Sequence, residues 1–277
     1  MANLAETQAA IDQLLLVVAT GFILLMQAGF ALVETGTVRS KNSKNILIKN
    51  LFDCCAGAIA FWAVGFAFAF GQEGDQGRFI GNKGTYFFAA DLNTEDGSNT
   101  WILWAFQFSF AATSATIVSG SLAERTQLPA YMLFSVLMTG FIYPVVVSWT
   151  WGGGWLGDGD NPENWGFHDF AGTGIVHMVG GVAGFVGAAV IGPRHGKEKN
   201  QARKRNIKNE PEYEAILADA SLGSREDIAN WLQNLDEDKE FAANSPPFVV
   251  VGTIILLVSW LFFNGGSTGS MFSDSTA

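Results

Sequence analysis

The sequence predicts an all-α polytopic membrane protein, and three features of its 277 residues support this fold class. Hydrophobic residues make up 49% of the chain and charged residues only 15%, whereas soluble domains carry about a quarter charged residues. Six apolar stretches reach the length of about 20 residues that a membrane-spanning helix needs. The last four stretches contain no Asp, Glu, Lys or Arg. The predicted spans are residues 11–36, 46–71, 100–123, 128–151, 170–192 and 247–270.

The few charged residues of the first two spans lie near the ends of those spans. They are Asp12 and Glu34 in the first span and Lys49 and Asp53 in the second. A helix on the surface of a soluble protein shows a polar face along its whole length, and these segments do not. We therefore expect each segment to cross the bilayer.

The basic residues predict how the spans are oriented. All 16 Lys and Arg residues except Arg78 and Lys83 lie in or beside the loops after the first, third and fifth spans. Positively charged loops stay on the cytoplasmic side of a membrane. The N-terminus is therefore predicted to lie outside, and the sixth span is predicted to end outside.

The loop after the fifth span, residues 193–246, is long, polar and expected to be cytoplasmic. Residues 211–220 and 224–235 are expected to form short helices, the second with a capping box formed by Ser224 and Asp227. A solvated surface loop is the favoured interpretation, and a docking site for a cytoplasmic regulator stays open. The net charge of −10 comes mostly from acids in loops, and the absence of a basic domain argues against a nucleic acid partner.

The cysteines give no indication of a metal site. Cys54 and Cys55 are adjacent within an apolar run, without a C-x-x-C pair or another metal-ligand spacing. We interpret both as small core residues, and we predict no metal and no cofactor.

The alternating directions of the spans place several residues at matching depths. Phe106 and Phe110 lie one turn apart on the third span, with Phe106 nearer the outside. The sixth span runs outward, so Ser267 is outer and Phe263 lies one turn deeper. The resulting layers are an outer one with Trp151, Phe106 and Ser267, a middle one with Phe110 and Phe263, and a deep one with His177.

Each layer suits one step in the passage of a small cation. Aromatic faces attract a cation by about 0.5–2 kcal/mol, and a hydroxyl such as that of Ser267 accepts a hydrogen bond from N–H. Two stacked phenyl rings exclude water and ions. An imidazole accepts or relays a proton near neutral pH. Because an ion crosses hydrocarbon at a high cost, losing a proton at the rings makes the passage easier.

Simpler structural roles exist for every one of these residues. With 23 Phe in the chain, a single Phe most often packs or faces lipid, and Trp151 fits an interfacial aromatic belt. Asp169 fits a cap of the fifth span. His177 is the strongest single signal, because it is the only ionisable side chain between residues 170 and 192. The nearby pair Gly180 and Gly184 predicts a closely packed neighbouring helix.

Several motifs, in this order and on these spans, resemble the ammonium transporter (Amt/Mep/Rh) superfamily, on its Amt side. They cover nearly the whole chain except the fifth loop. The motifs are M26-Q-A-G-F-A31 with V38-R-S-K-N42, G120-S-L-A-E-R125, W151-G-G-G154, D169-F-A-G-T-G-I-V-H177 and F263-N-G-G-S267.

The resemblance implies transport of ammonium or ammonia through an aromatic-gated, histidine-lined pore in the plasma membrane. It implies substrate recruitment by Phe106, Trp151 and Ser267, and a gate of Phe110 and Phe263. His177 resembles the first of two pore histidines, and Asp169 resembles an acid that supports the recruitment site. The family fold has eleven spans and forms trimers with one pore in each subunit. Residues 1–277 are therefore expected to be an incomplete transporter domain with spans one to six, a fragment of a channel that forms a homotrimer.

Two other classes of function are alternatives to transport. A non-conducting ammonium sensor or accessory subunit would bind ammonium at the outer layer and signal through residues 193–246. A membrane enzyme is not expected, because the spans contain no paired carboxylates, no Ser/His/Asp set and no metal cluster.

Overall fold

The computed structural model describes residues 4–72, 79–90, 92, 100–157, 164–197 and 241–272. Within these ranges six helical segments are long and apolar enough to cross a membrane. The secondary structure of the same ranges is helical apart from a bridge between Gly157 and Phe167. The prediction of an all-α polytopic membrane protein is confirmed. The predicted helices in residues 211–220 and 224–235 lie outside the described residues.

The first three spans are close to their predicted bounds. α1 (Leu4–Thr37) is the longest helix. The second span joins a short 3-10 turn (Ser40–Asn42), α2 (Ser43–Ala60), a π-helical turn (Phe61–Gly65) and α3 (Phe66–Phe70). A further 3-10 segment covers Gly84–Ala89, and the third span is α4 (Thr100–Leu122).

The last three spans also match, and two of them contain π-helical turns. The fourth joins α5 (Leu128–Leu137), a π-helical turn (Met138–Ile142) and α6 (Tyr143–Trp149). The fifth joins a π-helical turn (Thr173–Met178) and α7 (Val179–Ile191). The sixth is α12 (Pro246–Gly266), whose first turn is capped by Ser245.

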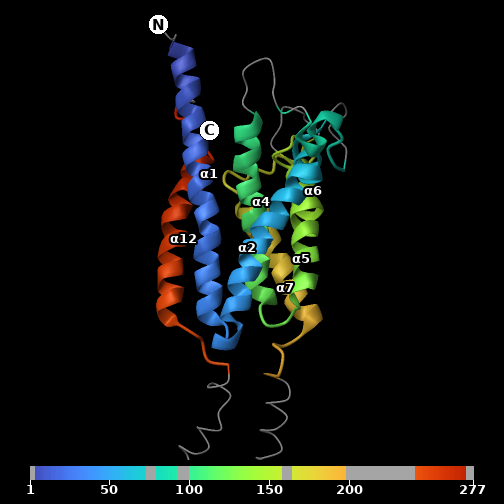
Figure 1. Ribbon diagram of the computed structural model, residues 1–277. Helices are drawn as coiled ribbons and strands as arrows, with labels where there is room; N and C mark the ends of the chain where they lie inside the picture. The colour runs from blue at the N-terminus through green and yellow to red at the C-terminus, as the bar shows by residue number, and fades with distance from the viewer. Residues whose placement is uncertain are drawn as a thin grey trace, which may run out of the picture.

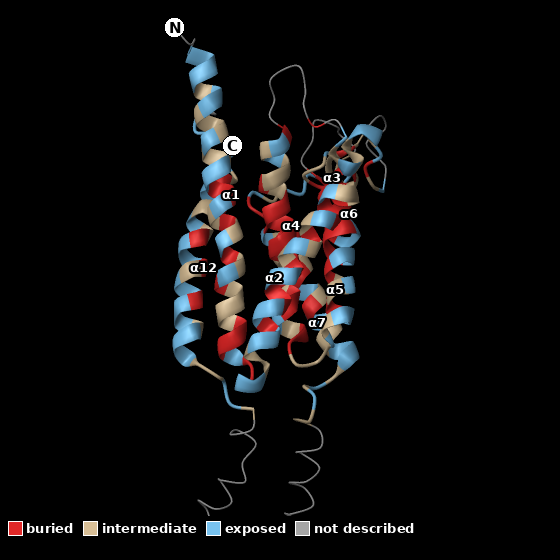
Figure 2. Ribbon diagram, viewed as in Figure 1, coloured by how far each residue is buried: buried red, intermediate tan, exposed pale blue. Residues whose placement is uncertain are grey.

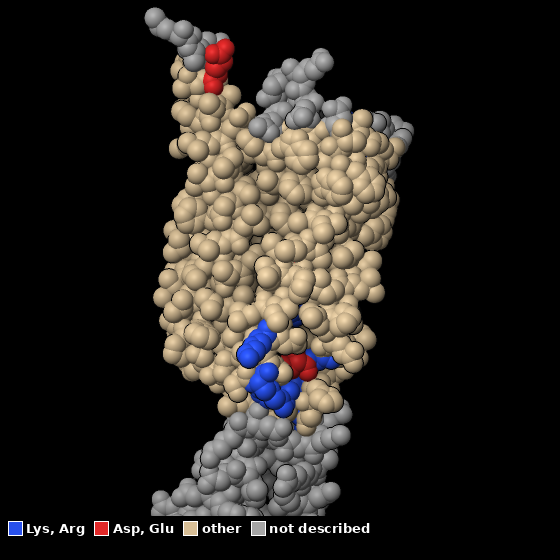
Figure 3. All heavy atoms as spheres, viewed as in Figure 1, with Lys and Arg blue, Asp and Glu red and all other residues tan. Residues whose placement is uncertain are grey.

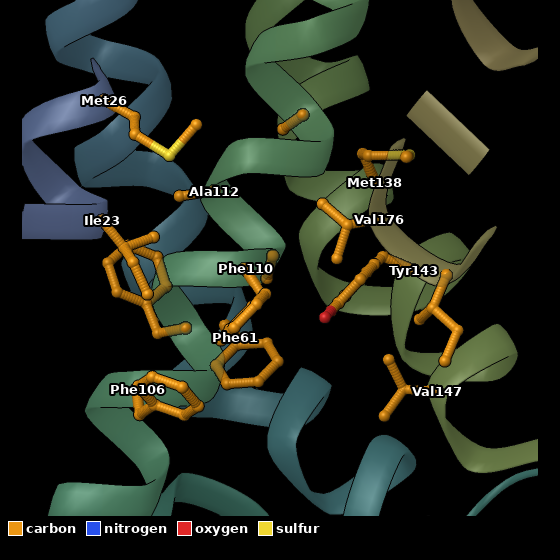
Figure 4. Close-up of a cluster of buried hydrophobic side chains, with 14 of the residues drawn as sticks. Ile23, Met26, Phe61, Phe106, Phe110, Ala112, Met138, Tyr143, Val147 and Val176 are labelled. Atoms are coloured by element: carbon orange, nitrogen blue, oxygen red, sulfur yellow. The ribbon is translucent and has the colours of Figure 1, made fainter. Parts of the chain in front are cut away.

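The helices form a bundle with α4 at its centre (Figure 1). α1 lies beside α12, and α4 contacts α1, α2 and α7. Figure 2 shows buried residues concentrated along α4, whereas α7 and α12 expose much of their surface. The apolar core contains Phe61, Phe110, Tyr143 and Phe263, and Figure 4 shows the part of it around α4.

α4 and α7 approach closely because both glycines of the predicted pair lie at their contact. A Cβ atom at Gly180 would lie 2.8 Å from the backbone oxygen of Ser114, and one at Gly184 would lie 2.6 Å from Oγ of Ser121. The prediction that this pair permits close helix packing is confirmed. The packing fixes the fifth span, and with it His177, against α4.

The interpretation of both cysteines as core residues is wrong for Cys55. Cys55 is exposed and Cys54 is partly buried. α2 instead buries its polar residues Lys49, Asn50 and Asp53. A polar side chain facing lipid finds no hydrogen-bond partner, so the helix turns its polar side inward and its cysteine outward.

Candidate functional site

Two of the phenyl rings in the candidate site come from α4. Phe106 and Phe110 lie one helical turn apart, with ring centroids 4.8 Å apart and planes inclined by 74°. This edge-to-face arrangement is favoured by the ring quadrupoles. Both rings are buried, and Figure 4 shows them on α4.

α12 brings a third phenyl ring to the same place. The centroid of Phe263 lies 4.4 Å from that of Phe110, with the planes inclined by 64°. Gly266 permits this approach, because a Cβ atom there would lie 2.5 Å from Cβ of Ala19 and 3.1 Å from the ring of Phe106. The structure therefore brings the two predicted gate residues, Phe110 and Phe263, into direct contact.

Ser267 follows one turn after Phe263 at the end of α12. Its hydroxyl donates to the backbone carbonyl of Phe263 at 2.8 Å. Because the hydroxyl proton is engaged in this hydrogen bond, the hydroxyl oxygen can act only as an acceptor for a further N–H donor. Ser267 is half-buried and directly follows the last residue of α12.

Trp151 lies just after α6 and meets Phe110 edge-on. The two ring centroids are 5.7 Å apart, with planes inclined by 78°. The indole Nε1 donates to the backbone carbonyl of Asp169 at 2.7 Å. This hydrogen bond fixes the indole to the segment that enters the fifth span. Phe106 and Trp151 thus contact the same ring, that of Phe110.

Asp169 organises the start of the fifth span. Its Oδ1 accepts from the backbone N–H groups of Gly172 and Thr173 at 2.8 and 3.0 Å. Its Oδ2 accepts from those of Gly174 and Ile175, both at 2.8 Å. The prediction that Asp169 caps this span is confirmed, since the carboxylate satisfies four N–H groups that the first turn leaves without partners.

His177 lies in the π-helical turn that Asp169 caps. Its ring centroid is 5.4 Å from that of Phe263 and 6.3 Å from that of Trp260. Its Nδ1 is 3.2 Å from the backbone oxygen of Gly172. A carbonyl only accepts hydrogen bonds, so Nδ1 carries the proton in this contact, and in the neutral ring Nε2 keeps its lone pair.

The aromatic line is the set of rings in which each contacts the next: Phe106, Phe110, Phe263 and His177, with Trp151 beside Phe110. The order matches the depths expected from the sequence. Two neighbours of His177 were missed. Trp260 lies three residues before Phe263 and so shares its helix face, which was a usable signal. The carbonyl of Gly172 gave no signal, because a π-helical turn is not visible in residue spacing.

A cluster of charged side chains joins the loops at the end of the bundle opposite to Trp151 and Ser267. Glu124 accepts from Nε of Arg39 at 2.9 Å and from Nη1 of Arg194 at 3.3 Å, and it also accepts from the Asn42 amide. Burial alone would raise the pKa of Glu124, but the hydrogen bonds from Arg39 and Asn42 outweigh it and hold this pKa below its usual value of 4.5. We call these four residues the loop clasp. Figure 3 shows basic side chains gathered around an acidic one at this end of the molecule.

The loop clasp explains why two of the sequence motifs occur together. Arg39 and Asn42 come from V38-R-S-K-N42, and Glu124 comes from G120-S-L-A-E-R125. Arg39 also donates to the backbone carbonyl of His195, and Arg125 donates to that of Gly192. Both motifs therefore hold the end of the fifth span.

Comparison with known proteins identifies the family. The family model described as the Ammonium Transporter Family matches residues 14–217 of this chain. The chain belongs to this family. Members of the ammonium transporter family are transporters or channels and not enzymes. This agrees with the expectation from the sequence that the chain is not an enzyme.

The relatives of this chain within the ammonium transporter family include bacterial and archaeal proteins. A putative ammonium transporter from Synechocystis is 41% identical over 195 residues, which are 70% of this chain and 42% of that protein. The ammonium transporter Amt2 from Archaeoglobus fulgidus is 35% identical over 258 residues, which are 90% of this chain and 46% of that protein. The chain spans less than half the length of either relative.

Solved structures show the same fold. A protein titled Sensor Amt Protein has a TM-score of 0.72 and 29% identity, with 96% of this chain and 57% of that chain covered. Mep2 from Candida albicans has a TM-score of 0.69 and 25% identity, with 97% of this chain and 50% of that chain covered.

Proposed function

We propose that this chain forms part of a transmembrane pathway for ammonium and ammonia, with the aromatic line as one wall of the pore. The observation that carries the proposal is the unbroken contact of Phe106, Phe110, Phe263 and His177 across three different helices. Membership of the ammonium transporter family supports the choice of substrate.

Recruitment takes place at the outer end of the line. Phe106 and Trp151 offer aromatic surface to a cation, and Ser267 offers a hydroxyl acceptor to an N–H group. Asp169 acts through its neighbours, since it holds the backbone carbonyl to which the Trp151 indole is bonded. Asp169 is thus a positioning residue with its carboxylate fully engaged.

The gate is the contact between Phe110 and Phe263. At a centroid separation of 4.4 Å the rings leave no room for a hydrated ion, so passage needs both dehydration and a shift of the rings. On the outer side of the rings ammonium transfers its proton to water, which forms a hydronium ion that returns to the outer solution, and neutral ammonia passes the rings. On the inner side, Nε2 of His177 accepts a hydrogen bond from N–H.

The remaining wall of the pathway needs residues beyond those of the aromatic line. His177 is only partly buried, and α7 and α12 expose apolar side chains such as Phe185 and Leu261. In this proposal a second set of spans covers these faces and supplies a second pore histidine. The complete subunits form a homotrimer in the plasma membrane, with the N-terminus outside and residues 193–246 in the cytoplasm.

A substitution of His177 tests this assignment. In the complete protein that carries this chain, reconstituted in lipid vesicles, we expect His177→Ala to change ammonium flux or the selectivity for ammonium over K⁺. The physical reason is the loss of the basic Nε2 nitrogen that this chain places on the inner side of the Phe110–Phe263 contact. Uptake and electrical current are measured together, because their ratio tells charged from neutral transport.

The matched control is His195→Ala, since His195 is exposed and lies beyond the fifth span. Flux, selectivity and current that are the same in His177→Ala, His195→Ala and wild type would refute the role of His177. If the wild-type protein carries no flux but still binds ammonium, the chain belongs to a sensor instead.

A further inference from the structure

A buried cluster of charged side chains lies apart from the aromatic line. We call it the interior acid cluster, and it consists of Glu34 on α1, Lys49, Asn50 and Asp53 on α2, and Tyr131 on α5. Each of these residues is at most 5% exposed. Asp53 lies ten residues after the start of α2, about 15 Å along the helix. The cluster therefore lies within the helices and not in the loops.

The ammonium group of Lys49 is fully engaged. Its Nζ lies 3.0 Å from Oε2 of Glu34, 3.0 Å from the carbonyl oxygen of Ser119 on α4, and 4.7 Å from the ring centre of Tyr131. The Asn50 amide donates to the same Oε2 at 3.2 Å. Glu34 is thus compensated by one full positive charge and one amide donor.

Asp53 has much weaker compensation. Its Oδ2 accepts from the hydroxyl of Tyr131 at 3.0 Å, which is a neutral donor. Its Oδ1 has no hydrogen-bond partner, although the residue is only 3% exposed. Oε1 of Glu34 is also buried without a partner. Two buried carboxylate oxygens are therefore unsatisfied in the same cluster.

The charges of the cluster do not balance. Two carboxylates and one ammonium group leave one negative charge if all three ionise, and a buried uncompensated charge is strongly unfavourable. α4 contributes only neutral groups here, the carbonyl of Ser119 and the hydroxyl of Thr116, which donates to Asn50. One further positive charge has to enter the cluster.

We infer that the interior acid cluster is a proton-binding site, and that Asp53 holds one exchangeable proton at its unpartnered oxygen Oδ1. A proton needs only this one oxygen, whereas a metal cation needs several oxygen ligands at once. Glu34 stays ionised because Lys49 and Asn50 hold it in that form. The bond from Tyr131 to Oδ2 is unchanged, since a protonated carboxyl group still accepts at its carbonyl oxygen.

This proton site is distinct from the proposed pore. The cluster links α1, α2, α4 and α5, whereas the aromatic line links α4, α12 and the fifth span. Ser119 lies nine residues after Phe110 on α4, about 14 Å along the axis. Proton uptake by Asp53 would therefore give the protein a response to pH that does not depend on His177.

Infrared spectroscopy of the complete protein in lipid vesicles tests the inference directly. A protonated carboxyl group gives a C=O stretching band that a carboxylate lacks. At about pH 7, where solvated Asp and Glu are ionised, we expect one such band from the cluster. Labelling all aspartates with ¹³C should shift that band, which assigns it to Asp without any substitution that could disturb folding.

The number of protonated carboxyl bands in substituted proteins then gives the number of protons that the cluster holds. Asp53→Asn should remove the band, and Asp12→Asn, which alters an acid at the opposite end of α1, should leave it unchanged. Lys49→Met should give a second band, from Glu34, because the compensating ammonium group is gone. The second band follows from the charge balance of the cluster. If Lys49 had only a structural role, Lys49→Met would not add a band.

Three results would overturn the inference. The first is a wild-type spectrum with no protonated carboxyl band at about pH 7. The second is a band that ¹³C-aspartate does not shift. The third is a band that appears only after Na⁺, K⁺ and ammonium are removed, which would mean that a bound cation supplies the missing charge. Because the readout is spectroscopic, failure of this inference is distinguishable from failure of ammonium transport.

Discussion

At Asp169 a single carboxylate accepts hydrogen bonds from four backbone N–H groups, and this explains how one residue shapes much of the candidate site. The same residue accepts the Trp151 indole N–H at its backbone carbonyl. Gly172, which follows in the left-handed conformation with φ of 88°, presents its carbonyl to His177. The orientations of Trp151 and His177 thus both depend on the short segment that Asp169 organises.

The aromatic face of Trp151 gives a prediction at this scale. If the indole attracts ammonium, Trp151→Leu should raise the half-saturating ammonium concentration by about 2- to 30-fold, which corresponds to about 0.5–2 kcal/mol of cation–π attraction. The measurement is the concentration dependence of uptake in vesicles. Trp165→Leu is the matched control, because Trp165 is exposed in the loop before the fifth span. An unchanged concentration dependence in Trp151→Leu would rule out a cation–π site at Trp151.

At the scale of helices, α4 is the element on which the others assemble. It carries Phe106 and Phe110 on the side of α12 and the fifth span, and Thr116 and the Ser119 carbonyl on the side of α2. Its contact with α7 is close because glycines line the α7 side. The π-helical turn before α7 shifts the register of the fifth span, and such turns often occur at functional sites.

Gly180 gives a prediction for this contact. A Cβ atom there would lie 2.8 Å from the backbone oxygen of Ser114 and 2.9 Å from Cβ of Ile117, so Gly180→Ala should separate α7 from α4. We expect a loss of about 1–3 kcal/mol of stability, typical of overpacking, and a reduced ammonium flux. Thermal unfolding in detergent measures the stability.

The neighbouring residue provides the control for that experiment. A Cβ atom at Gly181 would meet nothing within 4 Å, so Gly181→Ala should leave stability unchanged or raise it slightly. Equal thermal stability of the Gly180→Ala and Gly181→Ala proteins would contradict the close contact between α4 and α7.

At the scale of the whole molecule, basic side chains gather around an acidic one at one end of the bundle (Figure 3). The loop clasp joins the loop after α1, the loop after α4 and the segment after α7 around Glu124. The opposite end holds the outer part of the aromatic line. The orientation stays a prediction from the positions of the basic residues, and in it the clasp lies on the cytoplasmic side.

The clasp predicts a specific dependence of stability on pH. Because the pKa of Glu124 is lowered on folding, its stabilising contribution is complete above the usual pKa of 4.5 and is lost as the pH falls through the lowered value. Glu124→Gln should cost about 1–3 kcal/mol at neutral pH, and this difference from wild type should shrink on acidification. Thermal unfolding over a range of pH measures both effects.

The control for the clasp is Glu6→Gln, an acid in the exposed first turn of α1. A difference between wild type and Glu124→Gln that stays constant as the pH falls would show that the lowered pKa does not stabilise the clasp.

The sequence predicted the spans well because apolar length is a local pattern, and the six spans agree to within several residues at their ends. Alternating direction predicted an outer Phe106, a middle layer of Phe110 and Phe263, and a deep His177, and in the structure these rings contact one another from layer to layer. The interior acid cluster was missed, since Glu34, Lys49 and Asp53 looked like residues near span ends. Whether such residues face inward depends on the rotation of each helix, which residue spacing in a wholly apolar segment does not define.

The most direct test of the proposed pathway is ammonium uptake by vesicles containing the complete protein, compared between wild type and Phe110→Trp. A pathway along the aromatic line predicts saturable uptake above that of protein-free vesicles, and a marked reduction in Phe110→Trp, because a larger ring overfills the 4.4 Å contact with Phe263. Wild-type uptake no faster than that of protein-free vesicles, or equal uptake by a folded Phe110→Trp protein, would contradict a pathway along the aromatic line.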